Sequence, residues 1–153
     1  MMKPKLLISA CLCGENTKYN GKNNLIKEID LLKTIFDFVL ICPEVMGGLP
    51  IPRDPSEIKG TSVISSKGVN VTEAYQVGAQ MALKLAKEQH IKVALLKEKS
   101  PSCGKNEIYD GTFTGTRIKG LGITTKLLVQ NGISVYNELE INQLLGAVDL
   151  VET

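Results

Sequence analysis

The sequence has 153 residues, of which 43% are hydrophobic and 22% are charged, and its formal net charge is +2. This length suits one globular domain, because domains usually span roughly 100–200 residues, and we treat residues 1–153 as a single domain. The small net charge and the aromatic content of 5% exclude a dedicated nucleic-acid-binding module, which would carry a strongly basic face and aromatic stacking platforms.

Taken in chain order, the apolar residues predict strands and helices that alternate. The expected strands are residues 5–11, 38–42, 93–97 and 133–136. The expected helices are residues 25–36, 72–89, 123–131 and 138–145. We expect the helix over 72–89 to bury Val77, Met81, Leu85 and the neighbouring alanines. Strand–helix–strand units of this kind predict an open, mainly parallel α/β sheet with right-handed crossovers.

In two long segments the apolar residues follow neither the helical nor the strand periodicity. Residues 43–55 contain four prolines and two glycines, which make this segment too irregular for a helix or a strand. Its apolar residues favour an ordered loop that covers something, and long ordered loops are usually functional. Residues 100–119 form a second long loop, rich in glycine and threonine. A small hairpin is expected from residues 61–64 and 69–71.

The N-terminal region does not resemble a signal peptide. Met1-Met2-Lys3-Pro4-Lys5 leads into an apolar run that has no small-residue cleavage site. No apolar segment approaches the roughly 18 residues that are needed to cross a bilayer. We therefore expect a cytoplasmic protein without membrane contacts, in which the four cysteines are reduced and available for metal binding or catalysis.

Three of the predicted strands deliver a cysteine at their carboxyl ends: Cys11 and Cys42 end their strands, and Cys103 lies on the loop that follows residues 93–97. Ligand sites in open parallel sheets collect beyond the carboxyl ends of the strands, so we expect these three thiols to converge. Soft thiolates select zinc, Cu(I) or iron–sulfur clusters. The single histidine, His90, lies between a helix and a strand and offers no obvious fourth ligand for a Cys/His zinc site.

Cys13 follows Cys11 by two residues, and in an extended backbone these two side chains face the same way. Two interpretations are open. Cys13 completes a cluster held by four cysteines, which leaves no iron free. Alternatively it is only a nearby thiol, and three cysteines leave one iron open to a substrate, as catalytic zinc sites keep an open position.

Polar residues accompany two of these cysteines. Glu44 follows Cys42 by two residues, and an extended segment would direct the carboxylate and the thiol to the same side, as a general base requires. Ser100 and Ser102 lie on the loop of Cys103. Both serines could donate hydrogen bonds to a substrate or to cluster sulfur. Their alternative role is in the turn itself, where serine is common.

Two further residues are candidates for substrate binding. Arg53 follows the Gly-Gly-Leu-Pro-Ile-Pro run of the first long segment, where it could pair with Glu44, Asp54 or Asp110 and lock the loops, or contact an anionic group of a substrate. Tyr109 lies on the second long loop. None of the glycine clusters has the spacing of a phosphate-binding loop at a strand-to-helix turn.

Most of these residues belong to recognisable motifs. The motifs are Ser9-Ala10-Cys11-Leu12-x-Gly14, Tyr19-Asn20-Gly21, Cys42-Pro43-Glu44-x-x-Gly47-Gly48-Leu49-Pro50-x-Pro52-Arg53, Val71-Thr72, Leu96-Lys97-x-x-Ser100-Pro101-Ser102-Cys103-Gly104 and Ile108-Tyr109-Asp110-Gly111-x-Phe113. Together they resemble the TudS (thiouracil desulfidase) family, and the match covers nearly the whole chain.

The resemblance implies a three-layer Rossmann-like α/β domain with a mainly parallel sheet and long functional loops at the carboxyl ends of the strands. It also implies a [4Fe-4S] cluster bound by Cys11, Cys42 and Cys103, whose unique iron takes sulfur from a thiolated nucleobase while water oxygen replaces it. In this pattern Glu44 is the acid/base that handles the water, and Ser100 is a hydrogen-bond donor on the substrate side. Cys13 departs from the pattern, in which an apolar residue such as Leu is expected.

We therefore expect an iron–sulfur-dependent desulfidase that releases sulfide from a small thiolated pyrimidine, such as a thiouracil, by non-redox hydrolysis. A nucleic-acid polymer is not expected as a partner. One alternative is an iron–sulfur or metal-binding sensor module without catalysis, whose cluster is closed by Cys13. Another is a metal-free fold in which the thiols are structural.

Overall fold

The computed structural model describes residues 3–151, so residues 1–2 and 152–153 of the single domain predicted over 1–153 lie outside the described part. The central element is a four-stranded sheet in the order β2-β1-β5-β8. Its strands are β1 (Lys5–Ser9), β2 (Asp37–Ile41), β5 (Val93–Leu96) and β8 (Ser134–Asn137). Every neighbouring pair is parallel, so the carboxyl ends of all four strands lie at one edge.

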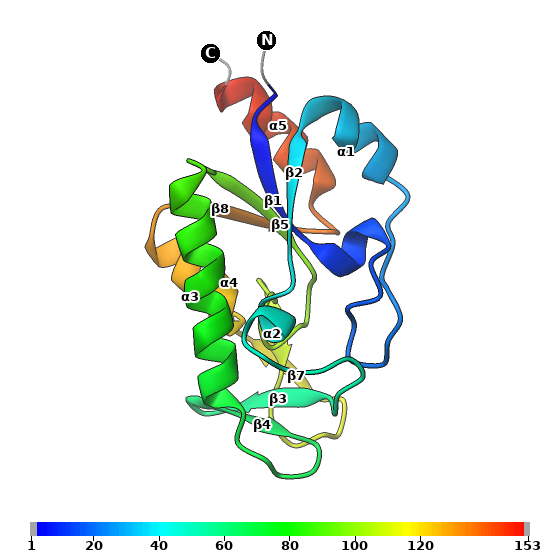
Figure 1. The fold of residues 1–153 in the computed structure, drawn as a ribbon, viewed down its shortest axis with the longest axis vertical. Coiled ribbons are helices and arrows are strands. Elements are labelled where there is room, and N and C mark those ends of the chain that lie inside the picture. Colours follow the sequence, from blue (N-terminus) through cyan, green and yellow to red (C-terminus); the bar gives the residue numbers. More distant parts are fainter. Residues whose placement is uncertain (1–2, 152–153) are drawn as a thin grey trace.

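Helices cover both faces of this sheet (Figure 1). Two helices pack on one face and two on the other: α1 (Ile29–Ile35) with α5 (Ile141–Val151), and α3 (Thr72–Glu88) with α4 (Ile123–Gln130). The predicted three-layer α/β architecture is therefore confirmed. No helix among residues 3–151 combines the length and the apolar character needed to span a membrane.

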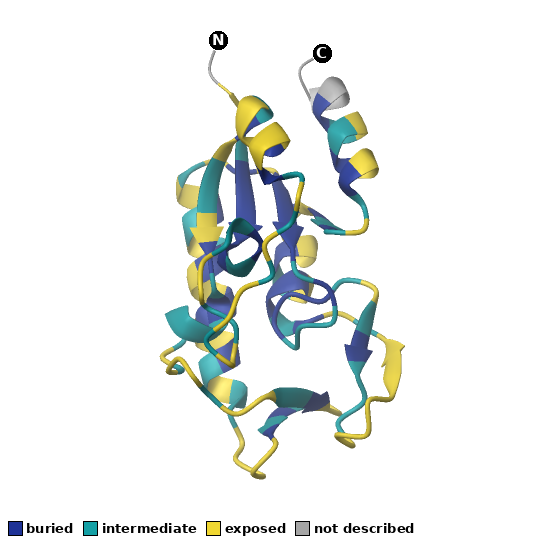
Figure 2. Cartoon of the chain, turned by 90° about the vertical axis from the view of Figure 1, so that its right-hand side faces the viewer, coloured by how far each residue is buried: buried dark blue, intermediate teal, exposed yellow. Residues whose placement is uncertain are grey.

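Each face of the central sheet has its own hydrophobic core, because side chains alternate between the two faces along each strand. On β1, Leu6 and Ile8 face the core under α1 and α5, whereas Leu7 faces the core under α3 and α4. All four residues of β5 are buried, because both faces of this central strand are covered by helices. Figure 2 shows buried central strands between helices whose outer sides are exposed, while the edge strand β2 is only partly buried.

The predicted strands are present, but two of them end earlier than expected and are followed by a short helical turn. After β1 the chain forms a 3-10 helix, η1 (Ala10–Cys13), and after β2 it forms α2 (Pro43–Met46). The expectation that residues 43–55 hold no helix was wrong at the start of that segment. Pro43 occupies the first helical position, where its fixed φ favours a helix and its missing N–H costs nothing.

The buried face of α3 differs from the predicted one. Val77 and Met81 were expected in the core but are 43% and 45% exposed. The helix instead buries a face of mostly small residues, namely Tyr75, Gly78, Ala79, Ala82 and Ala86. This face allows α2 to approach the backbone of α3, so close packing decides the orientation of the helix and overrides the larger apolar side chains.

Two antiparallel hairpins lie beyond the carboxyl ends of β1 and β2, in the lower part of Figure 1. They are β3 (Ser56–Lys59) with β4 (Ser62–Ser65), and β6 (Glu107–Tyr109) with β7 (Arg117–Lys119). The hairpin predicted from residues 61–64 and 69–71 was therefore wrong, because the partner of β4 is β3, and residue 70 contributes only an isolated bridge. Gly60, at φ 64°, forms the tight turn between β3 and β4.

Candidate functional site

The carboxyl edge of the sheet opens into a cavity of about 530 Å³. Its walls include Cys11, Cys42 and Cys103, which come from the segments after β1, β2 and β5. The predicted convergence of the three thiols is confirmed. Parallel pairing alone accounts for it, because β1 lies between β2 and β5 and the three strands end at the same edge.

Cys11 and Cys13 do not lie side by side on an extended strand, and that expectation was wrong. Both belong to η1, where three residues complete a turn, so side chains two positions apart point in different directions. Gly14, at φ 90°, ends η1 in a left-handed conformation. Both residues are partly buried against the core under α1 and α5, but Cys11 also lines the cavity and Cys13 is absent from its lining.

Cys42 precedes α2, and the position of α2 depends on two glycines. A Cβ on Gly47 would lie 1.9 Å from the backbone oxygen of Ala74, and a Cβ on Gly78 would lie 1.8 Å from that of Pro43. The backbones of α2 and α3 therefore touch, which only glycine allows. The Cys42 thiol reaches into the cavity and donates a long hydrogen bond of 3.8 Å to the carbonyl oxygen of Thr17.

The loop after β5 presents Cys103 through a turn built by Ser100. The Ser100 Oγ accepts hydrogen bonds from the backbone N–H groups of Ser102 (3.1 Å) and Cys103 (3.0 Å). Thr125 Oγ1 donates to the carbonyl oxygen of Cys103 at 2.8 Å, which ties the loop to α4. Both Ser100 and Cys103 line the cavity.

Ser102, which was predicted to bind substrate, is placed elsewhere. Its side chain is fully buried, its Oγ lies 2.8 Å from Thr124 Oγ1, and it does not line the cavity. The structure thus brings Ser100 but not Ser102 to the other candidate residues. Tyr109, at the end of β6, does line the cavity, on the wall that the second hairpin forms.

Glu44 lies on α2 with its carboxylate held by two donors. Arg53 Nε donates to Glu44 Oε1 at 3.0 Å, and the Tyr75 hydroxyl donates to the same oxygen at 2.8 Å. Of the pairings that the sequence left open for Arg53, the one with Glu44 is observed. Arg53 Nη2 also donates to Thr17 O at 2.9 Å, so this side chain, only 6% exposed, links the carboxylate to the loop after η1.

Tyr75 was not identified from the sequence. It lies in the first turns of α3, 31 residues from Glu44, and is 1% exposed. Burial raises the pKa of its hydroxyl, and the Glu44 charge and hydrogen bond raise it further, so Tyr75 stays protonated and acts as a donor. A tyrosine on a helical face of small residues is the only sequence signal that could have pointed to it.

Burial also changes the acidity of the thiols. It raises the pKa of Cys103 to about 12, with the neighbouring Cys11, Cys42 and Glu44 charges acting in the same direction. It raises the pKa of Cys11 above its usual value as well, although a hydrogen bond with Asn24 opposes the shift. These thiols are therefore protonated without metal, and a thiophilic metal centre would displace their protons on binding.

The donor set fits a sulfur-ligated metal centre. Three thiols from three different strands surround one cavity, and thiolate is the ligand that iron–sulfur clusters require. Among residues 3–148, whose side chains are described, no group of three or more His, Cys, Asp or Glu lies close enough to hold a single metal ion.

The fold and the site together define a class of protein, a Rossmann-like α/β protein with three cysteines and a fixed carboxylate around one cavity. Comparison with known families identifies the particular family within this class. The sequence model of 2-thiouracil desulfurase matches residues 6–140, so this chain belongs to the 2-thiouracil desulfurase family. The resemblance predicted from the motifs is therefore confirmed.

Two relatives support this assignment. The chain is 40% identical over 150 residues to the uncharacterized protein YbbK of Bacillus subtilis (strain 168). This match covers 92% of this chain and 99% of YbbK. It is also similar to the solved structure of the [4Fe-4S]-dependent thiouracil desulfidase TudS, with 42% sequence identity and a TM-score of 0.92. That match covers 97% of this chain and 99% of the TudS chain.

Proposed function

We propose that this chain is a [4Fe-4S]-dependent desulfidase that converts the C=S group of a thiouracil-like base into C=O by non-redox hydrolysis. One water is consumed and one hydrogen sulfide is released, so the atoms balance and no electron carrier is needed. The observation that carries the proposal is the meeting of three strand-end cysteines at one cavity with Glu44 in its wall. Family membership and the similarity to TudS support the same reaction.

Cys11, Cys42 and Cys103 are the proposed cluster ligands. Cys13 is not part of the cavity wall, which supports three protein ligands and one open position on the cluster. When bound, a [4Fe-4S] cluster supplies a sulfur-seeking Lewis acid that polarises the C=S bond. The rival interpretation, a sensor whose cluster is closed by Cys13, requires this thiol to move from the core to the cavity.

Glu44 is the proposed general base. Both donors to its carboxylate bind Oε1, and within the described side chains Oε2 has no hydrogen-bond partner. Oε2 is therefore available to accept a proton from a water molecule in the cavity. Arg53 and Tyr75 hold the carboxylate in one orientation, so they position Glu44 and need not contact the substrate.

Ser100 is the proposed donor on the substrate side. Its Oγ already accepts two backbone hydrogen bonds, so its own hydroxyl hydrogen is left to donate to a substrate heteroatom. Tyr109 also lines the cavity, where its ring can contact a flat base. These two residues and Glu44 would orient the substrate relative to the three cysteines.

The proposed substrate is a small thiolated pyrimidine, and a nucleic-acid polymer is not expected as a partner. A cavity of about 530 Å³ is within the range of about 300–1,000 Å³ that is typical of small-molecule sites. We propose a cytoplasmic location, because a reducing compartment keeps the cysteines free for metal.

Anaerobic reconstitution with iron and sulfide, followed by incubation with 2-thiouracil or 4-thiouracil, tests the proposal. We expect uracil and sulfide in equal amounts from the wild-type protein. Glu44→Gln should keep the cluster absorbance and lose about 10²–10⁴-fold in kcat, the usual contribution of a general base. A reconstituted wild-type protein that binds the cluster but releases no sulfide from either compound would refute the desulfidase.

Cys13→Ala separates the desulfidase from the sensor. We expect this variant to bind iron in the wild-type amount and to keep its turnover, because Cys13 lies outside the cavity wall. Cys103→Ala provides the matched comparison and should lose the cluster. Loss of iron from Cys13→Ala would support the closed cluster instead.

A further inference from the structure

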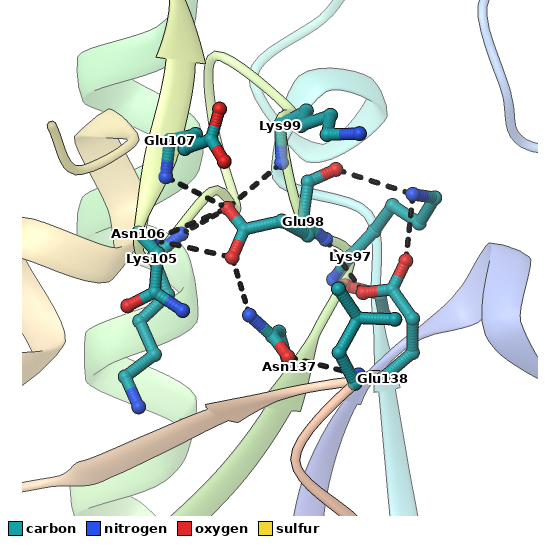
Figure 3. Close-up of polar contacts among 10 residues, drawn as sticks. Lys97, Glu98, Lys99, Lys105, Asn106, Glu107, Asn137 and Glu138 are labelled. Atoms are coloured by element: carbon teal, nitrogen blue, oxygen red, sulfur yellow. Dashed lines mark hydrogen bonds and ion pairs between the residues drawn. The ribbon is translucent and has the colours of Figure 1, made fainter. Parts of the chain in front are cut away.

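One residue of the cavity wall, Glu98, has no role in the proposed chemistry, yet its carboxylate is buried and fully hydrogen-bonded. Glu98 follows β5 and is 5% exposed. Four backbone N–H groups and one side-chain amide donate to it, as Figure 3 shows. The donors are Lys99 N (3.0 Å), Lys105 N (3.0 Å), Asn106 N (3.2 Å), Glu107 N (3.2 Å) and Asn137 Nδ2.

The four backbone donors come from both ends of one loop. Lys99 lies at the start of the segment 99–107 and the donors from Lys105 onward lie at its end, while Ser100 and Cys103 lie between them. A single carboxylate therefore closes the base of the loop that presents Cys103. Inside it, Gly104 N donates to Ser100 O at 2.8 Å and tightens the turn.

The same carboxylate connects the loop to the sheet. Asn137, its fifth donor, is the last residue of β8 and is 1% exposed, and its own Oδ1 accepts a hydrogen bond from Leu139 N at 2.9 Å. The backbone N–H of Glu98 donates to Glu138 Oε1 at 2.8 Å, and Lys97 Nζ pairs with Glu138 Oε2 at 2.6 Å. These contacts therefore anchor the loop to the ends of β5 and β8.

A buried carboxylate is costly unless hydrogen-bond donors compensate its charge. Burial alone would raise the pKa of Glu98, but the surrounding backbone N–H groups more than offset this and hold the pKa below its ordinary value. Glu98 is therefore charged, and its hydrogen bonds are of the strong, charge-assisted kind. Charge-assisted hydrogen bonds are roughly twice as strong as neutral ones, so they hold the loop more firmly.

We propose that Glu98 is a positioning residue of this site: its carboxylate locks both ends of the loop over residues 99–107 and thereby fixes Cys103 and Ser100 at the cavity. The catalytic meaning of this inference rests on the proposed function. Its structural content, a loop whose order depends on one charge, is independent of any cluster or substrate.

The test measures thiol accessibility in the protein without cluster, under reducing and oxygen-free conditions. Each cysteine is alkylated with iodoacetamide and its rate is followed by peptide mass spectrometry. In the wild type Cys103 should react slowly, because it is 5% exposed. In Glu98→Gln we expect Cys103 to react about tenfold faster or more, since losing a charge-assisted hydrogen bond costs about 1.5–3 kcal/mol of local stability.

Glu107→Gln is the matched control. It makes the same chemical change on the same loop, but its side chain is about half exposed and, within the described part of the chain, pairs only with Arg117. Its Cys103 rate should stay within about twofold of the wild type, as expected of a surface ion pair. Cys11 and Cys42 should keep their wild-type rates in both variants, because their segments do not depend on Glu98.

Two results would overturn the inference. An unchanged Cys103 rate in Glu98→Gln would show that the loop does not need the charge, and an equal acceleration at all four cysteines would show a general loss of stability. If Glu98→Gln does not fold, Glu98→Asp, which keeps the charge but shortens the reach, tests the hydrogen bonds themselves: Cys103 should again react faster, and an unchanged rate would overturn the inference. In the folded variant, the amount of iron bound after reconstitution should also fall. A wild-type protein that shows no turnover would refute only the proposed function and not the role of Glu98.

Discussion

The segments after β2 and β5 both bring a cysteine to the cavity, but they are held in place by different forces. The segment after β2 is fixed by contact between backbones, where Gly47 and Gly78 let α2 touch α3. The loop after β5 is fixed by hydrogen bonds to one buried charge, Glu98. The first arrangement should therefore be sensitive to added volume and the second to loss of charge.

Gly78→Ala should have the largest effect on stability. Its methyl group would lie 1.8 Å from Pro43 O, and because that oxygen belongs to the backbone, α2 must move away from α3. We expect a loss of about 3 kcal/mol or more in the free energy of unfolding, at the upper end for overpacking. Urea unfolding measures it.

Gly146→Ala is the control for that substitution. Gly146 lies in α5, and a Cβ there would have no neighbour within 4 Å among the described residues. The change should leave the stability unaltered or raise it by up to about 1 kcal/mol, because alanine favours a helix more than glycine does. Equal effects of the two substitutions would contradict backbone contact as the force that holds α2.

Glu98→Gln should have an intermediate effect on stability. With its oxygen at the Oε1 position, the neutral amide directs its NH₂ group at the Asn106 N–H and at Asn137 Nδ2, and the buried Asn137 donor loses its acceptor. We expect a loss of about 2 kcal/mol in the free energy of unfolding, since one unsatisfied buried group costs about 1–3 kcal/mol. A stability equal to that of Glu107→Gln would contradict a structural role for the charge.

The pH dependence should separate the two segments. The pKa of Glu98 is lower in the folded protein than its ordinary value of 4.5, so the charge stabilises the fold above about pH 4.5. As the pH falls through the folded pKa, the carboxylate becomes protonated and this stabilisation is lost. The stability difference between wild type and Glu98→Gln should therefore shrink below pH 4.5.

The corresponding difference between wild type and Gly78→Ala should stay constant over the same range, because a steric overlap does not titrate. Chemical unfolding of the three proteins between pH 3 and pH 7, near and below the ordinary range of glutamate, measures both differences. A Glu98→Gln difference that is independent of pH would contradict the charge as its origin.

Tyr75→Phe should have the smallest effect. The substitution removes one donor to Glu44 Oε1 and leaves Arg53 in place. We expect a loss of about 1 kcal/mol in stability and a roughly tenfold lower kcat with a similar KM, because Glu44 loses orientation but the substrate contacts remain. Tyr136→Phe, whose hydroxyl has no hydrogen bond among the described residues, should change neither quantity. A higher KM in Tyr75→Phe would argue instead for substrate contact.

The sequence by itself was sufficient for the parallel sheet and for the meeting of the three cysteines. Continuous apolar runs such as the one in β5 indicate buried strands, and parallel strands necessarily end at one edge. These are local patterns or direct consequences of strand direction. The sequence also offered Glu44 among the possible partners of Arg53, but it did not choose between them.

Only the tertiary structure decided how the cysteines are held. Tyr75 contacts Glu44 across 31 residues, and Asn137 contacts Glu98 across 39, and neither pairing leaves a local pattern in the chain. The same is true of the α3 face, which turned Gly78 rather than Met81 inward because α2 packs there. Such contacts depend on which surfaces meet after folding, and periodicity along the chain does not encode that choice.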